Sequence, residues 1–513
     1  MKINRTKNTK RNIVAGLINK FFLLLLPFVV RTVFIYSLGS EYLGLNSLFT
    51  SILTVMNVVE LGFSSAIVYS MYEPVAKDDF DTVCSLLNFY KTVYRAIGIV
   101  ILVIGIVIMP FLPHLIKGTC PSELNLYVLF AMYLLNTCLS YLLYAYKKSV
   151  LEVLQRRDII EINNLITVGL TNILQLILLI AWKNPHAYYI YLIIMILFTV
   201  VNNILNAKIV DKKYPQFVCR GQLSGEIKSS IKKQVSGLMI TRLCQMTRTS
   251  FDSIFISAFI GLTMATVYGN YYLIIQTLVG IMNIFTNSML AGVGNSVVAE
   301  SKEKNYSDFN TLNFIYMWIS GWSAITLFIL YQNFMKIWVG DELMLSLLGS
   351  LLFSLYYYSL KIGDIRAMFS DAIGLWWENR IRAVLEIITN IVLNYILVKK
   401  FGVYGIVGAT IIPMVGINFT GGAHVLYRYY FKDRQISKYF LDNLLYFIAT
   451  IFGAFVTWVV SEYMGQYNLL GLVKRGMICC ILPNIVYFVV YFKTSNYSMA
   501  KKWILRRLGS NKM

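Results

Sequence analysis

Two long apolar stretches of this sequence each contain two cationic side chains. Lys20 and Arg31 lie in the first stretch, and Arg242 and Arg248 lie in the seventh. A guanidinium offers a fork of donors that fits phosphate oxygens, whereas an ammonium acts as a point charge. A charge within a membrane-spanning segment is costly and usually faces a cavity or a partner. These four cations are therefore our candidates for binding an anionic, phosphate-bearing substrate.

Helical spacing gathers the polar residues of each stretch on one side. At 100° per residue the polar residues of the first stretch fall within about 120°; they are Asn12, Asn19, Lys20 and Arg31. In the seventh stretch, a group of four falls within about 60°, with Arg242 and Thr249 close beside it; the four are Thr241, Gln245, Arg248 and Asp252. Two structural interpretations stay open. Lys20 and Arg31 could extend to the membrane surfaces, and Arg248 could pair with Asp252 one turn away.

Acidic residues in apolar stretches are candidates for ion coupling or charge pairing. Glu60, in the second stretch, could bind a proton or a sodium ion, or could pair with Lys20; we favour pairing. Asp252 has the same two possibilities. We expect no cofactor and no metal site, because the seven cysteines and three histidines are scattered without metal-ligand spacing.

Composition identifies the environment of the chain. Of 513 residues, 57% are hydrophobic and 14% are charged, whereas soluble domains contain about 25% charged residues. The solvent for most of the chain must therefore be lipid. The net charge of +21 does not indicate nucleic acid, because the basic residues stand in short loops between apolar runs.

Apolar runs of membrane-spanning length predict an all-α integral membrane protein with about fourteen transmembrane helices. The predicted spans are 13–38, 44–71, 90–112, 124–146, 160–182, 187–207, 234–260, 265–293, 310–331, 343–362, 381–398, 403–427, 442–461 and 474–492.

The distribution of Lys and Arg predicts the orientation. When residues near the end of a span are counted with the adjacent loop, 35 of the 46 fall on the side of the N-terminus, seven on the opposite side and four deeper inside spans. Cytoplasmic loops carry the excess of cations, so both termini are expected in the cytoplasm. The loop from Glu73 to Asp81 is an exception, since it is acidic although it is placed inside.

The chain resembles itself at a displacement of about 222 residues, which indicates an internal repeat. Gly39 matches Gly261, and Lys20 falls on Arg242. Six spans separate the copies, so both have the same orientation. We expect two pseudo-symmetric six-helix lobes around a central cleft, followed by two further helices and a basic cytoplasmic tail. The boundaries are 1–212 for the N-lobe, 213–432 for the C-lobe and 433–513 for the remainder.

Several short motifs resemble those of the polysaccharide transporter family, which comprises O-antigen and capsule repeat-unit flippases of the multidrug/oligosaccharidyl-lipid/polysaccharide (MOP) exporter superfamily. The motifs are Leu38-Gly39, Tyr42-Leu43-Gly44, Glu60-Leu61-Gly62-Phe63-Ser64-Ser65-Ala66, Asn394-Tyr395-Ile396-Leu397 and Gly402-Val403-Tyr404-Gly405-Ile406-Val407-Gly408-Ala409-Thr410. Each motif is weak alone, since Gly-rich helix ends are common in membranes. Gly402, Gly405 and Gly408 indicate close helix packing rather than phosphate binding.

The resemblance implies a flippase, not an enzyme. It would move undecaprenyl-pyrophosphate-linked oligosaccharide, such as an O-antigen, capsule or exopolysaccharide repeat unit, from the inner to the outer leaflet of a bacterial cytoplasmic membrane by alternating access. The implied partners are this lipid-linked oligosaccharide and membrane lipid, with a polysaccharide polymerase and a chain-length regulator as further possibilities, and the chain would work as a monomer.

Two other function classes can be weighed from the sequence. A cation-coupled multidrug exporter of the same superfamily is the alternative, but four cations against Asp252 in the first and seventh spans disfavour a cationic substrate. An enzyme would need a sizeable external loop or domain for its chemistry. No extramembrane stretch exceeds about 30 residues, which is too short for a separate catalytic domain.

Overall fold

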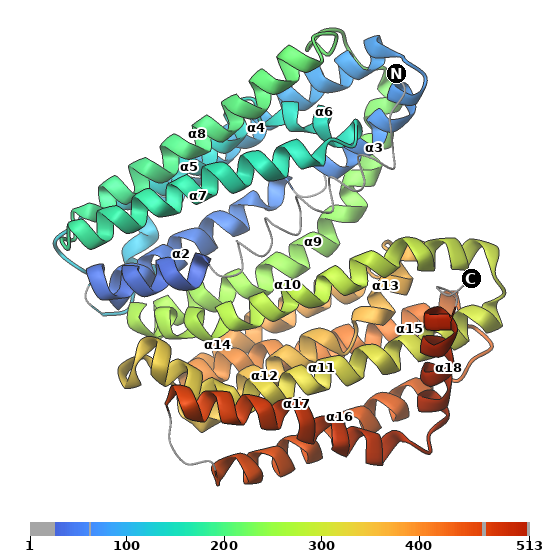
Figure 1. The fold of residues 1–513 in the computed structure, drawn as a ribbon. Coiled ribbons are helices and arrows are strands. Elements are labelled where there is room, and N and C mark those ends of the chain that lie inside the picture. The colour runs from blue at the N-terminus through green and yellow to red at the C-terminus, as the bar shows by residue number, and fades with distance from the viewer. Residues whose placement is uncertain (1–25, 61–62, 119, 464–467, 510–513) are drawn as a thin grey trace. The chain divides into compact units, whose positions relative to one another are not determined.

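The structure, a computed structural model, describes residues 26–60, 63–118, 120–463 and 468–509. All regular elements in these ranges are helices (Figure 1). Eight described helices are long and apolar enough to cross a membrane, and a ninth span is added when the bent pair Leu126–Leu142 and Ala145–Val153 counts as one. The predicted all-α membrane class is confirmed, and the described part of each predicted span falls on helices.

The chain divides into two compact units between Thr266 and Val267. The helices of the first unit are Leu26–Leu38, α2 (Ser40–Met56), α3 (Phe63–Ala76), α4 (Phe80–Ile108), α5 (Leu126–Leu142), α6 (Lys148–Val153), α7 (Arg157–Ala181), α8 (Ala187–Lys213) and α9 (Gly225–Phe259). Helix α10 (Leu262–Ala299) begins in the first unit and continues in the second.

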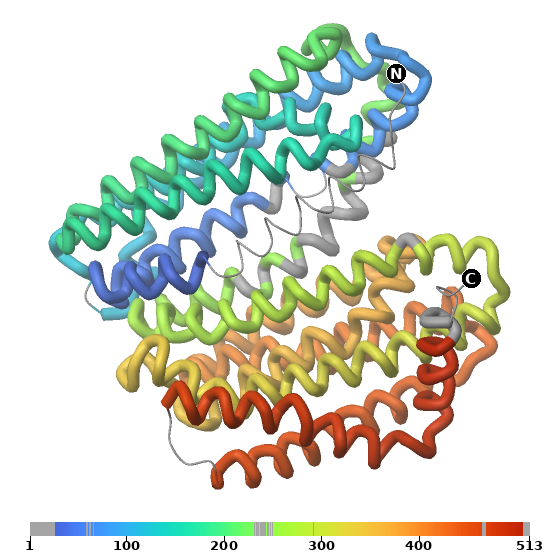
Figure 2. The backbone as a smooth tube through the Cα atoms, viewed as in Figure 1, coloured from blue at the N-terminus to red at the C-terminus, as the bar shows by residue number. Residues whose placement is uncertain are grey.

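The second unit contains most of α10 and the helices that follow it. These are α11 (Lys302–Val339), α12 (Leu347–Lys361), α13 (Asp364–Ile373), α14 (Arg380–Pro413), α15 (Thr420–Tyr429), α16 (Ile436–Glu462), α17 (Leu469–Tyr491) and α18 (Ser495–Gly509). Figure 2 follows the chain through the long helices of each unit.

Polar side chains fix where several helices begin. Asp79 accepts from the amide of Thr82 at the start of α4, Ser224 caps α9, and Ser301 caps α11. The first amides of a helix have no partner within the helix, so a side-chain oxygen at this position stabilises the end. The hydrogen bonds that Asp79 accepts from Thr82 also hold the pKa of the Asp79 carboxyl below its usual value.

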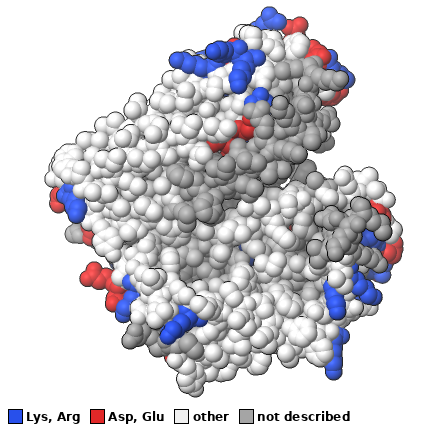
Figure 3. All heavy atoms as spheres, viewed as in Figure 1, with Lys and Arg blue, Asp and Glu red and all other residues white. Residues whose placement is uncertain are grey.

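Apolar side chains cover the outer faces of the units. On α7 the exposed residues Ile166, Leu170, Ile173, Ile177 and Ile180 follow one another every three or four positions and form a single stripe. On the face shown in Figure 3, charged atoms gather mainly toward the ends of each unit's helices and leave broad uncharged areas between them. Such surfaces are stable in lipid and not in water.

The acidic loop that follows α3 is partly neutralised by its neighbours. Lys77 Nζ lies 2.6 Å from Glu73 Oε1, and Arg220 Nη2 lies 2.9 Å from Asp81 Oδ1. The hydrogen bond from Lys77 lowers the pKa of the Glu73 carboxyl. Two of the four acidic side chains of this segment, Glu73 and Asp81, are therefore paired with cations.

The predicted eleventh and twelfth spans form a helical hairpin within one continuous run. Gly402 has φ 56° and ψ −134° inside α14, and the chain reverses there. Gly405 lies so close to the first arm that a Cβ atom on it would overlap the Leu397 carbonyl oxygen. Asn390 Nδ2 donates to the Ala409 carbonyl at 3.2 Å across the hairpin. The close packing expected of Gly405 is confirmed, Gly402 instead provides the positive φ of the reversal, and a Cβ on Gly408 would meet nothing within 4 Å, so the packing role expected of Gly408 is wrong.

The fourth span of each repeat is broken at a comparable point. In the first unit α5 is followed by a bend of 46° before α6. In the second unit α12 ends at Lys361 and α13 begins at Asp364. Broken helices within membrane proteins usually border a functional region, because the released backbone groups need new partners.

Helix α9 packs along α2 and α3 within the first unit. Lys117 N donates to the Ser257 carbonyl of α9 at 2.8 Å. The boundary between the two compact units therefore lies after α9. The boundary between lobes that the repeat predicts lies before α9, at residue 213. The division 1–212, 213–432 and 433–513 stays a prediction.

Candidate functional site

A buried polar cluster lies at the break between α12 and α13 in the second unit. Asp364, the first residue of α13, receives a hydrogen bond of 2.5 Å from the Tyr316 hydroxyl of α11 and an ion pair of 2.6 Å from Lys361 Nζ. The Lys361 side chain is 3% exposed. Two donors on one carboxylate oxygen fix its position.

A second cluster follows directly, on α13, α14 and the π-helical stretch Met414–Phe419. Glu386 Oε2 accepts from Arg382 Nη1 at 3.1 Å and from Asn418 Nδ2 at 2.7 Å. Asn418 Oδ1 in turn accepts from Arg366 Nη2 at 2.8 Å. Arg366 and Glu386 are 3% and 2% exposed. The π-helical stretch positions Asn418 between the two charged groups, and such stretches are frequent at functional sites.

The two clusters together contain more positive than negative charge. Lys361, Arg366 and Arg382 are cations, and Asp364 and Glu386 are carboxylates. The buried Nε atom of Arg366 has no hydrogen-bond partner among the described residues. An unsatisfied buried donor is unfavourable until an acceptor arrives. The arrangement can therefore bind an anion or exchange protons between its members.

Packing holds Arg366 in place. A Cβ atom on Gly422 of α15 would overlap Arg366 Nη1. The guanidinium therefore passes directly over the Gly422 backbone, and only glycine leaves room for it there.

The first unit has a corresponding carboxylate that receives a tyrosine hydroxyl. Tyr90 donates to the Tyr94 hydroxyl at 2.7 Å, and Tyr94 donates to Glu60 Oε1 at 2.8 Å. Glu60 ends the 3-10 turn Asn57–Glu60, which interrupts the second span after α2. The structure thus pairs Glu60 with Tyr94. The expected partner Lys20 lies outside the described residues.

Two pairs of positions 222 residues apart make polar contacts of the same kind in the two units. Tyr94 and Tyr316 are 222 residues apart, and each donates to a carboxylate. Asn164 and Glu386 are also 222 residues apart. Asn164 Oδ1 accepts from Asn202 at 2.8 Å, as Glu386 accepts from Asn418. Their partners do not follow this spacing, because Glu60 and Asp364 lie 304 residues apart.

Of the four cations predicted to bind substrate, the structure describes the side chains of two, Arg31 and Arg248. Arg31 donates from Nη2 to the Thr266 carbonyl, 3.1 Å away at the start of α10, which anchors it to backbone. Arg248 is partly exposed on α9, and Asp252 on the same helix is completely buried. Arg242 falls on α9, but its side chain lies outside the described residues. A substrate-binding role for Lys20, Arg31, Arg242 and Arg248 stays a prediction.

Sequence reasoning missed the clusters of the second unit. Lys361 stands inside the predicted span 343–362, and Arg382 and Glu386 stand inside 381–398. These charged residues within predicted spans were the sequence signal that could have identified the clusters. Asp364 and Arg366 fall just beyond a span, where the sequence cannot distinguish a buried charge from a loop charge.

The geometry of the units is shared with known transporters. No family model matches this chain, and no curated protein matches it by sequence. Among solved structures, the lipid II flippase MurJ in an inward closed conformation superposes with a TM-score of 0.67 at 14% identity, over 93% of this chain and 99% of that one. The fold is that of MurJ and the MATE transporters.

Two MATE proteins show the same likeness. An inward-facing multidrug resistance MATE transporter of the MOP superfamily has a TM-score of 0.62 at 14% identity, over 83% of this chain and 98% of its own. A mutant form of the Vibrio cholerae MATE transporter VcmN has a TM-score of 0.57 at 15% identity, over 85% of this chain and 99% of its own. These neighbours are membrane transporters and not enzymes.

Proposed function

We propose that this chain is a flippase that moves undecaprenyl-pyrophosphate-linked oligosaccharide from the inner to the outer leaflet of a bacterial cytoplasmic membrane. The observation that carries the proposal is the excess of cations in the buried clusters of the second unit, where Arg366 also retains an unsatisfied donor. The superposition on a lipid flippase over 93% of the chain supports it.

Transport would proceed by alternating access of the two lobes. The pyrophosphate would bind cations from each lobe, with Lys20, Arg31, Arg242 and Arg248 contributing, while the lipid tail stays in the bilayer. An inside-negative potential favours outward movement of an anion by about 2.3 kcal/mol per charge per 100 mV. A proton or sodium gradient at Glu60 or Asp252 could add to this driving force. A polysaccharide polymerase and a chain-length regulator would act on the product outside.

A cation-coupled multidrug exporter is the second candidate. The likeness to MATE transporters, the buried carboxylates Asp252 and Glu386 and the partly buried Glu60 favour it. Carboxylates attract cationic compounds and can take up protons in exchange.

One vesicle experiment separates these candidates. The full chain is reconstituted in liposomes with a fluorescent undecaprenyl-pyrophosphate oligosaccharide, and an impermeant quencher reports how much remains in the outer leaflet. We expect protein-dependent exchange between leaflets that is faster under a potential favouring anion movement and slower in Arg248→Ala and Lys20→Ala. Lys183→Ala, in a loop, is the matched control. Exchange of a cationic dye without exchange of the glycolipid would refute the flippase and support the exporter.

A further inference from the structure

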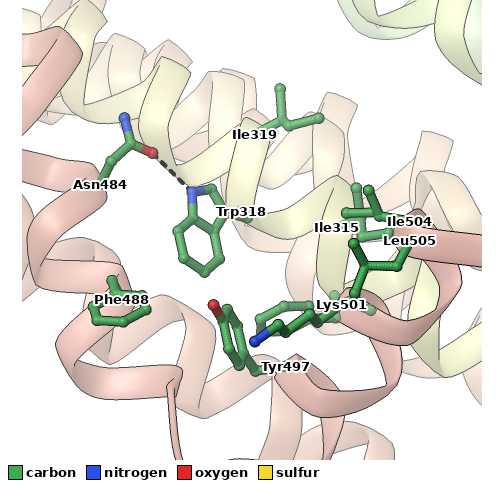
Figure 4. A pocket seen from close by; sticks show the side chains of 11 residues that line it. Ile315, Trp318, Ile319, Asn484, Phe488, Tyr497, Lys501, Ile504 and Leu505 are labelled. Atoms are coloured by element: carbon green, nitrogen blue, oxygen red, sulfur yellow. Dashed lines mark hydrogen bonds between the residues drawn. The ribbon is translucent and has the colours of Figure 1, made fainter. Parts of the chain in front are cut away.

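A groove of about 520 Å³ opens on the surface of the second unit between α11, α17 and α18 (Figure 4). Trp318 and Ile319 come from α11, Phe488 from α17, and Ile504 and Leu505 from α18. Phe488 and Leu505 are about half exposed. A groove of this composition on a membrane protein will be filled by hydrocarbon, because water gains no hydrogen bonds there.

Two polar side chains in the wall of the groove, Trp318 and Asn484, are already paired. Trp318 Nε1 donates to Asn484 Oδ1 at 2.8 Å, as the dashed line in Figure 4 shows, and Asn484 Nδ2 donates to the Cys480 carbonyl at 2.9 Å. Along Trp318, Ile319 and Phe488 the wall is therefore mainly apolar. The part of a ligand buried there is expected to be a plain hydrocarbon chain.

A cation stands at one edge of the groove. Lys501 of α18 lines the groove and is exposed, and Figure 4 shows its amine beside the Tyr497 ring. Helix α18 begins four residues after the spanning helix α17 ends at Tyr491, so it follows the membrane boundary closely. Lysine near a bilayer surface attracts anionic lipid headgroups.

We propose that this groove binds an anionic phospholipid of the leaflet next to α18, with one acyl chain along Trp318 and Phe488 and the headgroup phosphate at Lys501. The apolar lining suits an acyl chain, and the exposed cation at its edge suits an anionic headgroup. The bound lipid would fasten α18 to the transmembrane helices.

Lys501 and its neighbour Lys502 provide a matched pair for the test. Both are exposed on α18, but only Lys501 lines the groove. The purified full chain is titrated with phosphatidylglycerol and, separately, with phosphatidylcholine, and retained lipid is counted by native mass spectrometry. We expect Lys501→Ala to weaken retention of phosphatidylglycerol about fivefold, since one cation at a membrane surface contributes about 1 kcal/mol. Lys502→Ala should retain it as the parent does.

A second variant tests the groove itself. Ile504→Glu places a negative charge on an exposed groove residue and should abolish the preference for phosphatidylglycerol without changing the melting temperature of the lipid-free protein. Equal retention by the Lys501 and Lys502 variants would overturn the proposal. So would displacement of phosphatidylglycerol by undecaprenyl phosphate, which would assign the groove to a polyprenyl tail. Neither result depends on whether the chain transports glycolipid.

Discussion

At the scale of single residues, the buried ions of the second unit depend on one another. Glu386 accepts hydrogen bonds from Arg382 and Asn418, and Asn418 in turn accepts one from Arg366. A buried ion pair adds little net stability, yet removing one member leaves the other charge uncompensated in a low dielectric. The network should therefore be sensitive to the loss of any single charge.

Replacing the central carboxylate tests this dependence. Glu386→Gln keeps the shape of the side chain but leaves Arg382 and Arg366 without their countercharge, and we expect a loss of about 3 kcal/mol in unfolding free energy. The measurement is the melting temperature in detergent. Glu303→Gln is the control, because Glu303 pairs with Arg434 at 3.4 Å on the surface, where a charge pair contributes little. Equal melting temperatures for both variants would contradict the proposed dependence.

A variant that displaces the Arg366 guanidinium without removing it tests whether the position of this charge matters for transport. Gly422→Ala must displace the Arg366 guanidinium, since a Cβ would overlap Nη1, whereas Gly416→Ala meets nothing within 4 Å. We expect the first variant to lower vesicle flipping at least tenfold and the second to leave it unchanged. If both variants transport equally, the position of Arg366 is unimportant for the activity.

At the scale of elements, glycine decides where two helices can touch. The reversal inside α14 uses the positive φ of Gly402 and then brings Gly405 against the Leu397 carbonyl. A side chain at the contact would push the arms of the hairpin apart and strain the Asn390–Ala409 hydrogen bond across it.

Two alanine variants of this hairpin have opposite expected outcomes. Gly405→Ala forces a methyl group into a backbone oxygen that cannot move aside easily, so we expect a loss of about 1–3 kcal/mol. Gly408→Ala meets nothing within 4 Å and should leave the melting temperature unchanged. A stable Gly405→Ala protein with unchanged activity would show that the arms are not packed at this point.

At the scale of the whole molecule, the number of spans fixes which loops share a side. The predicted arrangement places Lys183 outside and Lys302 inside, with both termini in the cytoplasm. In a chain whose other accessible cysteines are replaced by serine, Lys183→Cys should react with an impermeant maleimide on intact cells. Lys302→Cys should react only after permeabilisation. Labelling of both on intact cells would contradict the alternation of spans.

Sequence alone determined the membrane class, the helical spans and the repeat of about 222 residues. Hydrocarbon imposes long apolar runs, and backbone hydrogen bonds in lipid must close within a helix, so these features can be read along the chain. The same reasoning singled out Glu60, because an acid in an apolar run is unusual. It also identified Gly405 as a packing glycine.

Only the tertiary structure decided which charges meet. Lys361, Asp364 and Tyr316 come from α12, α13 and α11, and Arg366 reaches Glu386 through Asn418 on a later π-helical stretch. Burial and pairing depend on which faces of distant helices pack together, and hydropathy along the chain does not contain that information. For the same reason the predicted spans leave Arg366 between them, whereas packing over Gly422 places it inside the second unit.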